Sequence, residues 1–360
     1  MKKSSRAFDD VFEDDEPAED MYSLGLSTKY NKHSYKKTRL VEKKSSVHET
    51  HQGTVIAGIG ALWLVNVFVT ENATDPTIIE CKAGGIIISE HQDSSLIAVG
   101  DHVGIELDQS HQTLSGTIVR VGQRTTRLSR VVAAKNKTEQ VLVSNVDQLV
   151  IVMAAAEPFF NVRLIDRYLI AADKGDITPI ICINKIDLMP QEFVEAQLEV
   201  YKDLGIQSLF TSVKQNTGIT ELMHVLAHKS SVLSGPSGVG KSSLTNALLG
   251  ENTQRTQAVS ESSFKGTHTT SSVKMFALNN GGYLVDTPGL REFAIWDLSL
   301  DELPYYFSEF DEFRHKCKFN SCSHTHEPSC AVIDAVTQGF IHPERYQSYC
   351  NIRDSLLENS

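Results

Sequence analysis

The chain has 360 residues and a mass of 39.9 kDa, which suits two or three domains better than one. With 41% hydrophobic and 22% charged residues, it can bury a substantial core, so global disorder is excluded. No run of eighteen apolar residues occurs, and no membrane-spanning helix is expected. The first twenty residues also lack an apolar signal segment, which argues against secretion.

Charge is distributed unevenly near the N-terminus. The net charge of −11 argues against nucleic acid as a partner for the chain as a whole. Residues 9–20 carry eight acids and no base, whereas residues 27–44 carry seven Lys or Arg against one Glu. Such blocks are typical of solvated tails, so residues 1–50 are predicted to be a disordered charged tail. The basic block, with its interleaved Tyr and His side chains, is also compatible with RNA binding.

Short β patterns separated by Gly, Asp and Asn follow the tail. They occur at residues 62–67, 77–81, 102–107 and 115–119. Several short strands in so compact a stretch predict a small barrel of the OB type over residues 51–123. A β-sandwich and an SH3-like barrel remain alternatives, because periodicity does not separate these folds.

Beyond the barrel, continuous apolar strands alternate with amphipathic helices. Residues 148–154 and 177–183 are predicted strands, and Val194, Leu198 and Tyr201 recur at helical spacing. This alternation predicts a parallel sheet covered by helices on both faces.

A Gly-rich segment between a β run and a helical stretch fits the pattern G-x-x-x-x-G-K-[ST]. With its flanking serines it comprises Ser234, Gly235, Pro236, Ser237, Gly238, Val239, Gly240, Lys241, Ser242 and Ser243. The backbone N–H groups of such a loop surround phosphate oxygens. Lys241 should reach the β- and γ-phosphates, and the Ser242 hydroxyl should bind Mg²⁺. The segment therefore predicts a nucleotide-phosphate site.

An aspartate at the end of another predicted strand supports this site. Asp286 closes a β run and begins the string Asp-Thr-Pro-Gly, and an Asp at this place can hold Mg²⁺ through water. The N–H of Gly289 can contact the γ-phosphate. Thr269 or Thr270 is expected to complete the Mg²⁺ coordination in the triphosphate state, and spacing does not choose between them.

A polar motif that directly follows a predicted strand consists of Asn184, Lys185, Ile186 and Asp187. The Asp187 carboxylate can accept hydrogen bonds from guanine N1–H and the 2-amino group, a donor pair that adenine lacks. Asn184 can bond the base and brace the P-loop, while the Lys185 stem can lie against the ring. Ser212 and Val213 stand at the next strand end, where a backbone N–H can meet guanine O6. The predicted ligand is a guanine nucleotide, GTP or GDP.

Near the C-terminus, Cys317, Cys322, His324 and Cys330 supply three thiolates and an imidazole. Soft and borderline ligands in this number suit one structural Zn²⁺, with His326 as a rival for the imidazole position. So few cysteines, half of them in this cluster, indicate a reducing compartment and no disulfide framework. Residues 293–360 are predicted to form a mostly helical zinc-binding domain.

The nucleotide motifs resemble those of the translation-factor class of GTPases, but in rotated order. In that class the P-loop comes first, whereas here residues 184–187 and 212–214 precede residues 235–242. A parallel βα sheet tolerates this when the original termini lie close together. The resemblance implies a circularly permuted P-loop GTPase domain of the α/β class over residues 124–292.

Taken whole, the multidomain chain resembles the RsgA (YjeQ) family of small-ribosomal-subunit biogenesis GTPases. The strings GPSGVGKSS, NKIDL and DTPGLREF carry this resemblance, together with the order of barrel, permuted GTPase and Cys-x4-Cys-x-His-x5-Cys domain. The family implies cytoplasmic hydrolysis of GTP to GDP, stimulated by the small subunit in late maturation, and contacts of both flanking domains with rRNA. A monomer is expected. The Ser-Val-Lys string at 212–214 and the acidic block depart from the family pattern.

The predicted catalytic residues are His268, Lys241 and Gly289. Leu290 follows Gly289 and cannot orient a water molecule as the Gln of Ras-like enzymes does. A slow intrinsic rate is therefore expected, with His268 placing the water when a partner orders its loop. Packing or RNA contact is the alternative role for His268.

Three alternative functions share part of this pattern. A permuted GTPase that serves the large subunit or another RNA would carry the same nucleotide motifs. A P-loop ATPase or kinase would share the Gly-rich loop but does not explain residues 184–187. A nucleic-acid-binding module with an inactive nucleotide site is the third.

Overall fold

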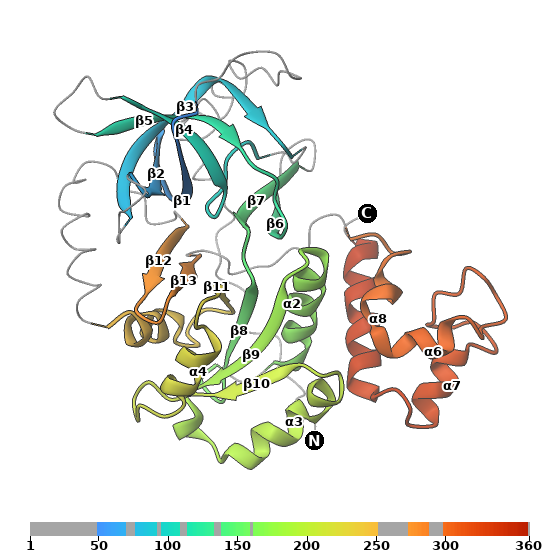
Figure 1. The fold of residues 1–360 in the computed structure, drawn as a ribbon. Coiled ribbons are helices and arrows are strands. Elements are labelled where there is room, and N and C mark those ends of the chain that lie inside the picture. Colours follow the sequence, from blue (N-terminus) through green and yellow to red (C-terminus); the bar gives the residue numbers. More distant parts are fainter. Residues whose placement is uncertain are drawn as a thin grey trace, which may run out of the picture.

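The computed structural model describes residues 49–69, 76–91, 95–108, 114–132, 138–158, 161–250, 273–287 and 298–358. Figure 1 shows them as a barrel, a central sheet with helices and a helical C-terminal body. Outside the described residues lie nearly all of the predicted tail, at 1–48, and His268, Thr269, Thr270 and Gly289. No helix of the described part is both long and apolar enough to cross a bilayer.

The barrel consists of β1 (His51–Ile59), β2 (Leu62–Val67), β3 (Thr77–Ser89), β4 (His102–Asp108) and β5 (Ser115–Val121). Their order is β1-β2-β3-β5-β4, and β4 pairs back onto β1, which closes the barrel. Only β3 and β5 are parallel neighbours. A closed five-stranded barrel confirms the OB-like prediction over the sandwich alternative. Alternate apolar residues such as Val65, Ile79 and Ile105 fill its core.

The central sheet contains β8 (Gln148–Ala154), β9 (Thr178–Asn184), β10 (Gln207–Phe210), β11 (Ser230–Ser234), β12 (Lys274–Leu278) and β13 (Gly282–Asp286). Its order is β10-β9-β8-β11-β13-β12, and every neighbouring pair is parallel except β12 with β13. β8 and β9 read as continuous apolar runs because both of their faces are covered. β11 lies in the middle although β8, β9 and β10 precede it in the chain, as the predicted permutation requires.

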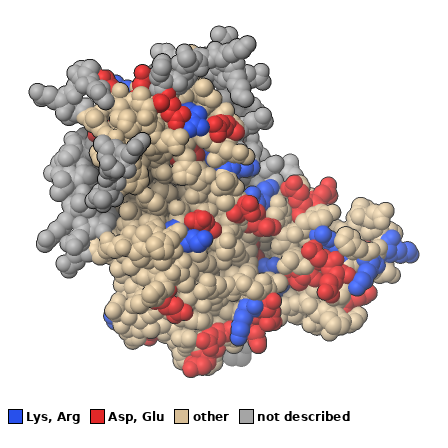
Figure 2. Space-filling view, in the orientation of Figure 1, with Lys and Arg blue, Asp and Glu red and all other residues tan. Residues whose placement is uncertain are grey.

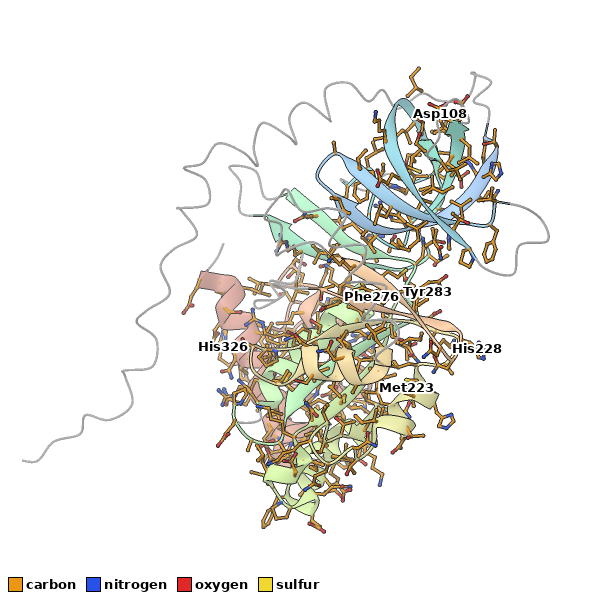
Figure 3. All side chains as sticks on the ribbon, turned by 90° about the vertical axis from the view of Figure 1, so that its left-hand side faces the viewer. Asp108, Met223, His228, Phe276, Tyr283 and His326 are labelled. Atoms are coloured by element: carbon orange, nitrogen blue, oxygen red, sulfur yellow. The ribbon has the colours of Figure 1, made fainter. Side chains whose placement is uncertain are left out.

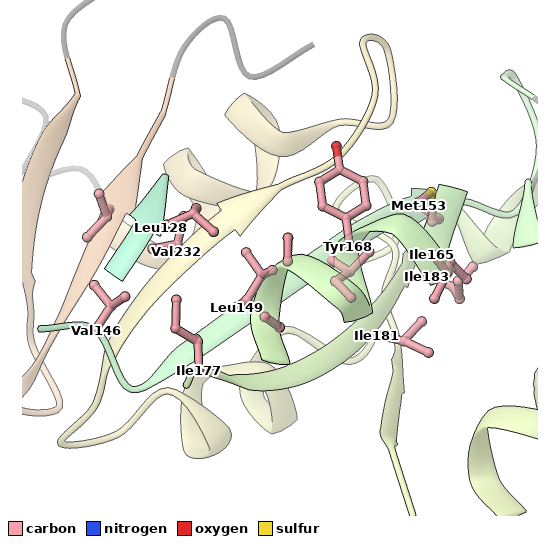
Figure 4. Close-up of a cluster of buried hydrophobic side chains, with 14 of the residues drawn as sticks. Leu128, Val146, Leu149, Met153, Ile165, Tyr168, Ile177, Ile181, Ile183 and Val232 are labelled. Atoms are coloured by element: carbon pink, nitrogen blue, oxygen red, sulfur yellow. The ribbon is translucent and has the colours of Figure 1, made fainter. Parts of the chain in front are cut away.

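Helices cover both faces of this sheet. On one face lie α2 (Val162–Lys174) and α3 (Gln191–Asp203); on the other lie α4 (Ile219–Val225) and the helical residues 241–250. The predicted apolar stripe of α3, at Val194, Leu198 and Tyr201, is buried. Figure 4 shows Ile165 and Tyr168 of α2 above the sheet residues Leu149 and Ile181. The two-sided α/β prediction is therefore confirmed.

A hairpin that the sequence analysis did not identify joins the barrel to the sheet. It consists of β6 (Arg127–Val132) and β7 (Thr138–Ser144). Beside it, Arg124 and Asp101 form a buried ion pair at 2.7 Å, and Ser144 Oγ donates to Asp101 Oδ1 at 2.6 Å. Leu128 packs into the core of the central sheet, so the hairpin belongs to both neighbouring bodies.

The C-terminal body contains η2 (Leu303–Tyr306), η3 (Ser308–Phe310), α6 (Asp311–Arg314), α7 (Ala331–Thr337) and α8 (Pro343–Glu358). It is mostly helical, as predicted, and its core is aromatic: Phe307 and Phe310 both meet Tyr349 edge-on, at 5.4 and 5.0 Å between ring centroids. Arg345 of α8 joins it to α2 by an ion pair with Asp166 at 2.5 Å.

Candidate nucleotide and metal sites

The nucleotide motifs meet at the carboxyl edge of the central sheet. β9 ends at Asn184, β11 at Ser234 and β13 at Asp286, and Asp286 pairs directly with Leu233 of β11. Ligands of open α/β sheets bind at this edge, where neighbouring connections leave a crevice. The order of the strands thus brings together residues that are more than 100 positions apart in the sequence.

Two glycines let the P-loop lie against its neighbours. Gly235 has φ +148°, and a Cβ built there would stand 2.1 Å from the carbonyl oxygen of Val152. Gly240 has φ +95°, and its Cβ would stand 2.3 Å from Nδ2 of Asn184. Since no other residue fits either place without displacement, the loop is pressed onto β8 on one side and onto the Asn184 motif on the other. Val239 is buried between them.

Asn184 braces the P-loop as the sequence suggested. Its Nδ2 donates to the Val239 carbonyl at 2.9 Å, and its Oδ1 accepts from Thr211 Oγ1 at 3.2 Å. Asn184 and Thr211 are both buried, so these bonds fix the amide orientation. Sequence reasoning missed Thr211; a hydroxyl residue at the end of a predicted strand was the available signal.

Asp187 is held by the strand end next to it. Ser212 Oγ donates to Asp187 Oδ1 at 2.6 Å, and Lys214 Nζ lies 4.0 Å from Oδ2. Only a backbone contact was expected from residues 212–214, but the Ser212 hydroxyl fixes the carboxylate. Lys185 takes a left-handed conformation at φ 58° and donates from Nζ to the carbonyl of Glu157.

The remaining motif residues differ in exposure. Ile186 lies in η1 (Ile186–Leu188) and packs on the sheet core, and Val213 is half-buried. On the P-loop, Ser234 is buried, whereas Ser237 and Gly238 are exposed. Polar groups of the loop that face solvent are therefore free to meet a ligand from outside.

Lys241 and Asp286 form the charged part of the site. Lys241 Nζ donates to the carbonyls of Gly235 and Pro236 at 2.6 and 2.7 Å. Burial raises the pKa of the Asp286 carboxyl, while the positive charges of Lys241 and Lys274 act in the opposite direction.

A divalent cation fits the donors at this edge. The hydroxyl-bearing Ser242 is exposed on the first turn of the helix over residues 241–250, and Asp286 ends the strand next to the P-loop. Hydroxyl and carboxylate oxygens are ligands that Mg²⁺ prefers, usually together with phosphate oxygens and water. These two residues would hold Mg²⁺ with a bound nucleotide.

The structure brings the four predicted metal ligands of the C-terminal body together. One ligand atom from each of Cys317, Cys322, His324 and Cys330 lies within 4.8 Å of the others. Cys317 Sγ and Cys330 Sγ are 3.9 Å apart, and His324 Nδ1 is 3.6 and 3.5 Å from them. Tetrahedral Zn²⁺ with bonds of about 2.3 Å to sulfur separates its thiolates by about 3.8 Å, so the cluster is consistent with a zinc site.

The surroundings of this Cys3His cluster suit a metal. Burial raises the pKa of the Cys322 thiol to about 12 and lowers the pKa of His324, so burial disfavours the charged form of each group, and a cation bound beside the sulfur would offset that cost for the thiolate. Tyr346 donates to the His324 carbonyl at 2.8 Å. His326, the rival ligand, is outside the cluster, and its Nδ1 lies 3.0 Å from Thr325 Oγ1.

Known sequences agree with this architecture. The RsgA GTPase family profile matches residues 121–296. A protein of Chlorobaculum parvum named small ribosomal subunit biogenesis GTPase RsgA is 41% identical over 317 residues, covering 87% of this chain and all of that protein. The protein of the same name from Chlorobaculum tepidum is 42% identical over 86% of this chain and 99% of its own length.

Solved structures show the same arrangement. The crystal structure of YloQ, described as a circularly permuted GTPase, superposes with a TM-score of 0.64 at 27% identity, covering 88% of this chain and 99% of that one. YjeQ from Thermotoga maritima superposes with a TM-score of 0.65 at 31% identity, covering 85% and 98% of the two chains. Since two relatives of that name are 41% and 42% identical over nearly their whole length, and the family profile covers the P-loop sheet, the chain belongs to the RsgA family of circularly permuted GTPases.

Proposed function

We propose that the chain hydrolyses GTP to GDP and phosphate, and that it acts in late maturation of the small ribosomal subunit in the cytoplasm, as a monomer. One observation is the main support for guanine as the base of the nucleotide. The Asp187 carboxylate is fixed by Ser212 at 2.6 Å, and its motif is braced to the P-loop through Asn184. A fixed pair of acceptor oxygens at this place matches the two donors of guanine.

The chain's own residues would act by positioning and charge. Lys241 would exchange its two carbonyl partners, Gly235 and Pro236, for the β- and γ-phosphate oxygens. The P-loop N–H groups would bind the same phosphates, and the N–H of Gly289 would contact the γ-phosphate. His268 would place the attacking water.

Two metals belong to this proposal. Mg²⁺ would be held by Ser242, by Asp286 through water, and by Thr269 or Thr270, and it would neutralise charge on the phosphates. One Zn²⁺ would be held by Cys317, Cys322, His324 and Cys330 and would stabilise the C-terminal body.

The proposed partner is the small subunit with its rRNA. Support comes from the relatives, which are named for biogenesis of that subunit. On the face shown in Figure 2, acidic and basic side chains are mixed over the C-terminal body. Any contact of that face with RNA would therefore be local and strongly dependent on salt.

The direct test measures GTP turnover with isolated small subunits, with large subunits and alone. A slow basal rate that rises with small subunits alone is the expected result, because Leu290 cannot orient water. Stimulation by large subunits would instead favour a GTPase that serves the large subunit. Hydrolysis of ATP as fast as GTP would favour a P-loop ATPase instead.

The role of His268 is tested in the same assay. His268→Ala should leave binding of GTP and subunits near normal and lower the stimulated rate about a hundredfold or more, as loss of a proton-transfer or water-positioning group does. A stimulated rate within a few-fold of the wild type would leave water positioning to the ribosome.

Base selection is tested by Asp187→Asn. The amide replaces one of two acceptor oxygens by a donor, so GTP affinity should fall about ten- to a hundredfold while xanthine nucleotides gain. Competition of GTP and XTP against a fluorescent nucleotide measures this. Asp203→Asn, an exposed position at the end of α3, is the matched control and should bind as the wild type does.

A further inference from the structure

The segment that follows β8 lies between the two nucleotide motifs. In the central sheet, β8 pairs with β9 on one side and with β11 on the other. β9 ends at Asn184, and β11 leads into the P-loop. Directly after β8, the N–H of the buried Ala155 donates to the Asn184 carbonyl at 2.8 Å. Residues 156–158 therefore leave the sheet at the edge where ligands of such sheets bind.

Two exposed residues of this turn, Glu157 and Pro158, meet both motifs. The Glu157 carbonyl accepts a hydrogen bond from Nζ of Lys185. Pro158 faces the P-loop, because a Cβ built on Gly238 would stand 3.6 Å from Cδ of the proline. Neither residue belongs to a motif identified from the sequence, yet the turn connects the Asn184 motif with the P-loop.

Glu157 holds an unfavourable backbone conformation. Its φ is +53°, and Lys185, its hydrogen-bond partner, has φ +58°. Left-handed conformations are uncommon for residues other than Gly, Asn and Asp. They persist where the surrounding structure imposes them, which is often at binding sites. The Glu157 side chain is exposed, so its burial does not impose this φ, whereas its carbonyl is fixed by Lys185.

The hydrogen bond fixes the far end of the Lys185 side chain. A lysine loses much rotamer freedom when its side chain is immobilised. With Nζ held by Glu157, this loss occurs before a ligand binds, so binding is less costly. The apolar stem between Cα and Nζ is then held at the edge of the Asn184 motif, where the ring of a base can pack on it.

We propose that Glu157 is a positioning residue of the nucleotide site, whose left-handed backbone places its carbonyl to hold Lys185 against the guanine ring. This role rests on the proposed function, because it requires a guanine nucleotide at this edge. The backbone conformation of Glu157, and not its carboxylate, is the property that matters. A substitution that disfavours positive φ therefore weakens nucleotide binding, whereas one that removes only the charge does not.

The test compares substitutions that all remove the charge of Glu157 but differ in their tolerance of positive φ. Valine, branched at Cβ, disfavours the left-handed region. Glu157→Val should therefore raise the Kd for a fluorescent GDP analogue about three- to tenfold. Asparagine and glycine accept this region, so Glu157→Asn and Glu157→Gly should bind the analogue at least as tightly as the wild type.

Asp176→Val is the matched control. Asp176 is exposed and has φ +57°, so valine there introduces the same kind of backbone strain. It precedes β9 and lies at the amino edge of the sheet, as does His228, which precedes β11 and is labelled in Figure 3. Both valine variants should lose similar stability in urea, but only Glu157→Val should lose GDP affinity.

A double-mutant cycle with Lys185→Met shows whether Glu157 acts through Lys185. Lys185→Met should itself weaken GDP binding, and adding Glu157→Val should then cost less than about twofold more. Losses that multiply in full would overturn the proposal, as would equal affinities of Glu157→Val and Glu157→Gly or a loss of affinity in Asp176→Val. If the wild type binds no guanine nucleotide, the proposed function fails first.

Discussion

The P-loop and the Cys3His cluster are both formed by loops, but different parts of the structure hold them in place. The P-loop begins at the end of β11, presses on the backbone of β8 through Gly235 and is bonded through Val239 to Asn184 at the end of β9. Its shape is thus set by three neighbouring strands. Each of those strands is paired on both sides within the sheet.

The Cys3His loop has no strand beneath it. Its backbone is held by one carboxylate, Glu327, which accepts from the N–H groups of Ser323 at 2.7 Å, Thr325 at 3.2 Å and His326 at 3.3 Å. Two tyrosines of α8 add one bond each, from the Tyr349 hydroxyl to the Ser323 carbonyl at 2.7 Å and from the Tyr346 hydroxyl to the His324 carbonyl at 2.8 Å. The sheet-based site should therefore keep its form without a ligand, whereas the loop-based site should depend on its metal.

Removal of the metal should have the largest effect. Cys330→Ser, or a strong chelator, should remove stabilisation of the C-terminal body on the order of 10 kcal/mol, because metal binding to such small sites supplies folding free energy. Metal analysis and hydrogen exchange measure the loss. GDP binding should persist.

The matched control is Cys350→Ser. Cys350 lies on α8 outside the cluster, and this variant should keep its metal. If GDP binding is lost together with the metal, the two sites are not independent and the comparison is wrong.

Loss of the Arg345 side chain should have the second-largest effect on stability. Its guanidinium bonds Asp166 of α2 and, at 2.7 Å, Glu309, and its side chain is 5% exposed. Arg345→Met leaves the buried Asp166 carboxylate without its counter-ion, although the Tyr201 hydroxyl still donates to it at 2.8 Å, and this loss should cost about 3–5 kcal/mol. Urea unfolding should show the loss, while metal content stays unchanged.

Arg353→Met, on the same helix but not fully buried, is the control and should unfold near wild-type urea concentrations. Metal loss in Arg345→Met would show that the contact with α2, and not the cluster alone, holds the loop. That result would weaken the contrast between the two sites.

Gly240→Ala should have a smaller effect on stability and a large one on binding. The new Cβ would stand 2.3 Å from Asn184 Nδ2 at a positive φ, a strain of about 1–3 kcal/mol. GDP affinity should fall at least tenfold, because the brace to Val239 must shift. Gly250→Ala has φ +68° and no atom within 4 Å, so it reproduces the backbone strain without the clash and should bind GDP normally.

The sequence predicted those parts whose chemistry is local. The P-loop and the Asn184 motif are short sequences in which each residue type has a defined chemical role. Continuous apolar strands such as β8 indicate a parallel sheet that is covered on both faces. The metal ligands lie within fourteen positions of one another. For these features a few neighbouring residues determine the geometry.

Contacts between distant segments were not predictable in this way. Arg345 and Asp166 are 179 positions apart. The sequence next to either residue gives no indication that the two form an ion pair. The role of Thr211 depends on the pairing of β10 beside β9. The extra residue Ile56 in β1, between Val55 paired with Val65 and Ala57 paired with Leu64, appears only when β1 pairs with β2. Such features follow from the placement of whole strands and helices, which periodicity leaves open.

The smallest predicted effect concerns Glu327, the carboxylate that holds the Cys3His loop. Although partial burial opposes it, hydrogen bonds from Ser323 and His326 lower the pKa of Glu327 well below its usual value of 4.5. An acid with a lowered pKa in the folded state contributes stability that is present above the unfolded pKa. That contribution is lost as the pH falls below about 4.5 toward the folded value.

Glu327→Gln keeps one acceptor oxygen and removes the charge, so it should cost about 1 kcal/mol at pH 7 after allowance for solvent screening. Because acid also releases the metal, the useful quantity is the difference between wild type and variant in free energy of unfolding at each pH, at equal metal content. That difference should be constant from pH 7 to about pH 5 and then shrink. Glu344→Gln, an exposed acid on α8, supplies the baseline. A difference that does not change with pH would mean that the shape of Glu327, and not its charge, holds the loop, and that the metal alone organises this site.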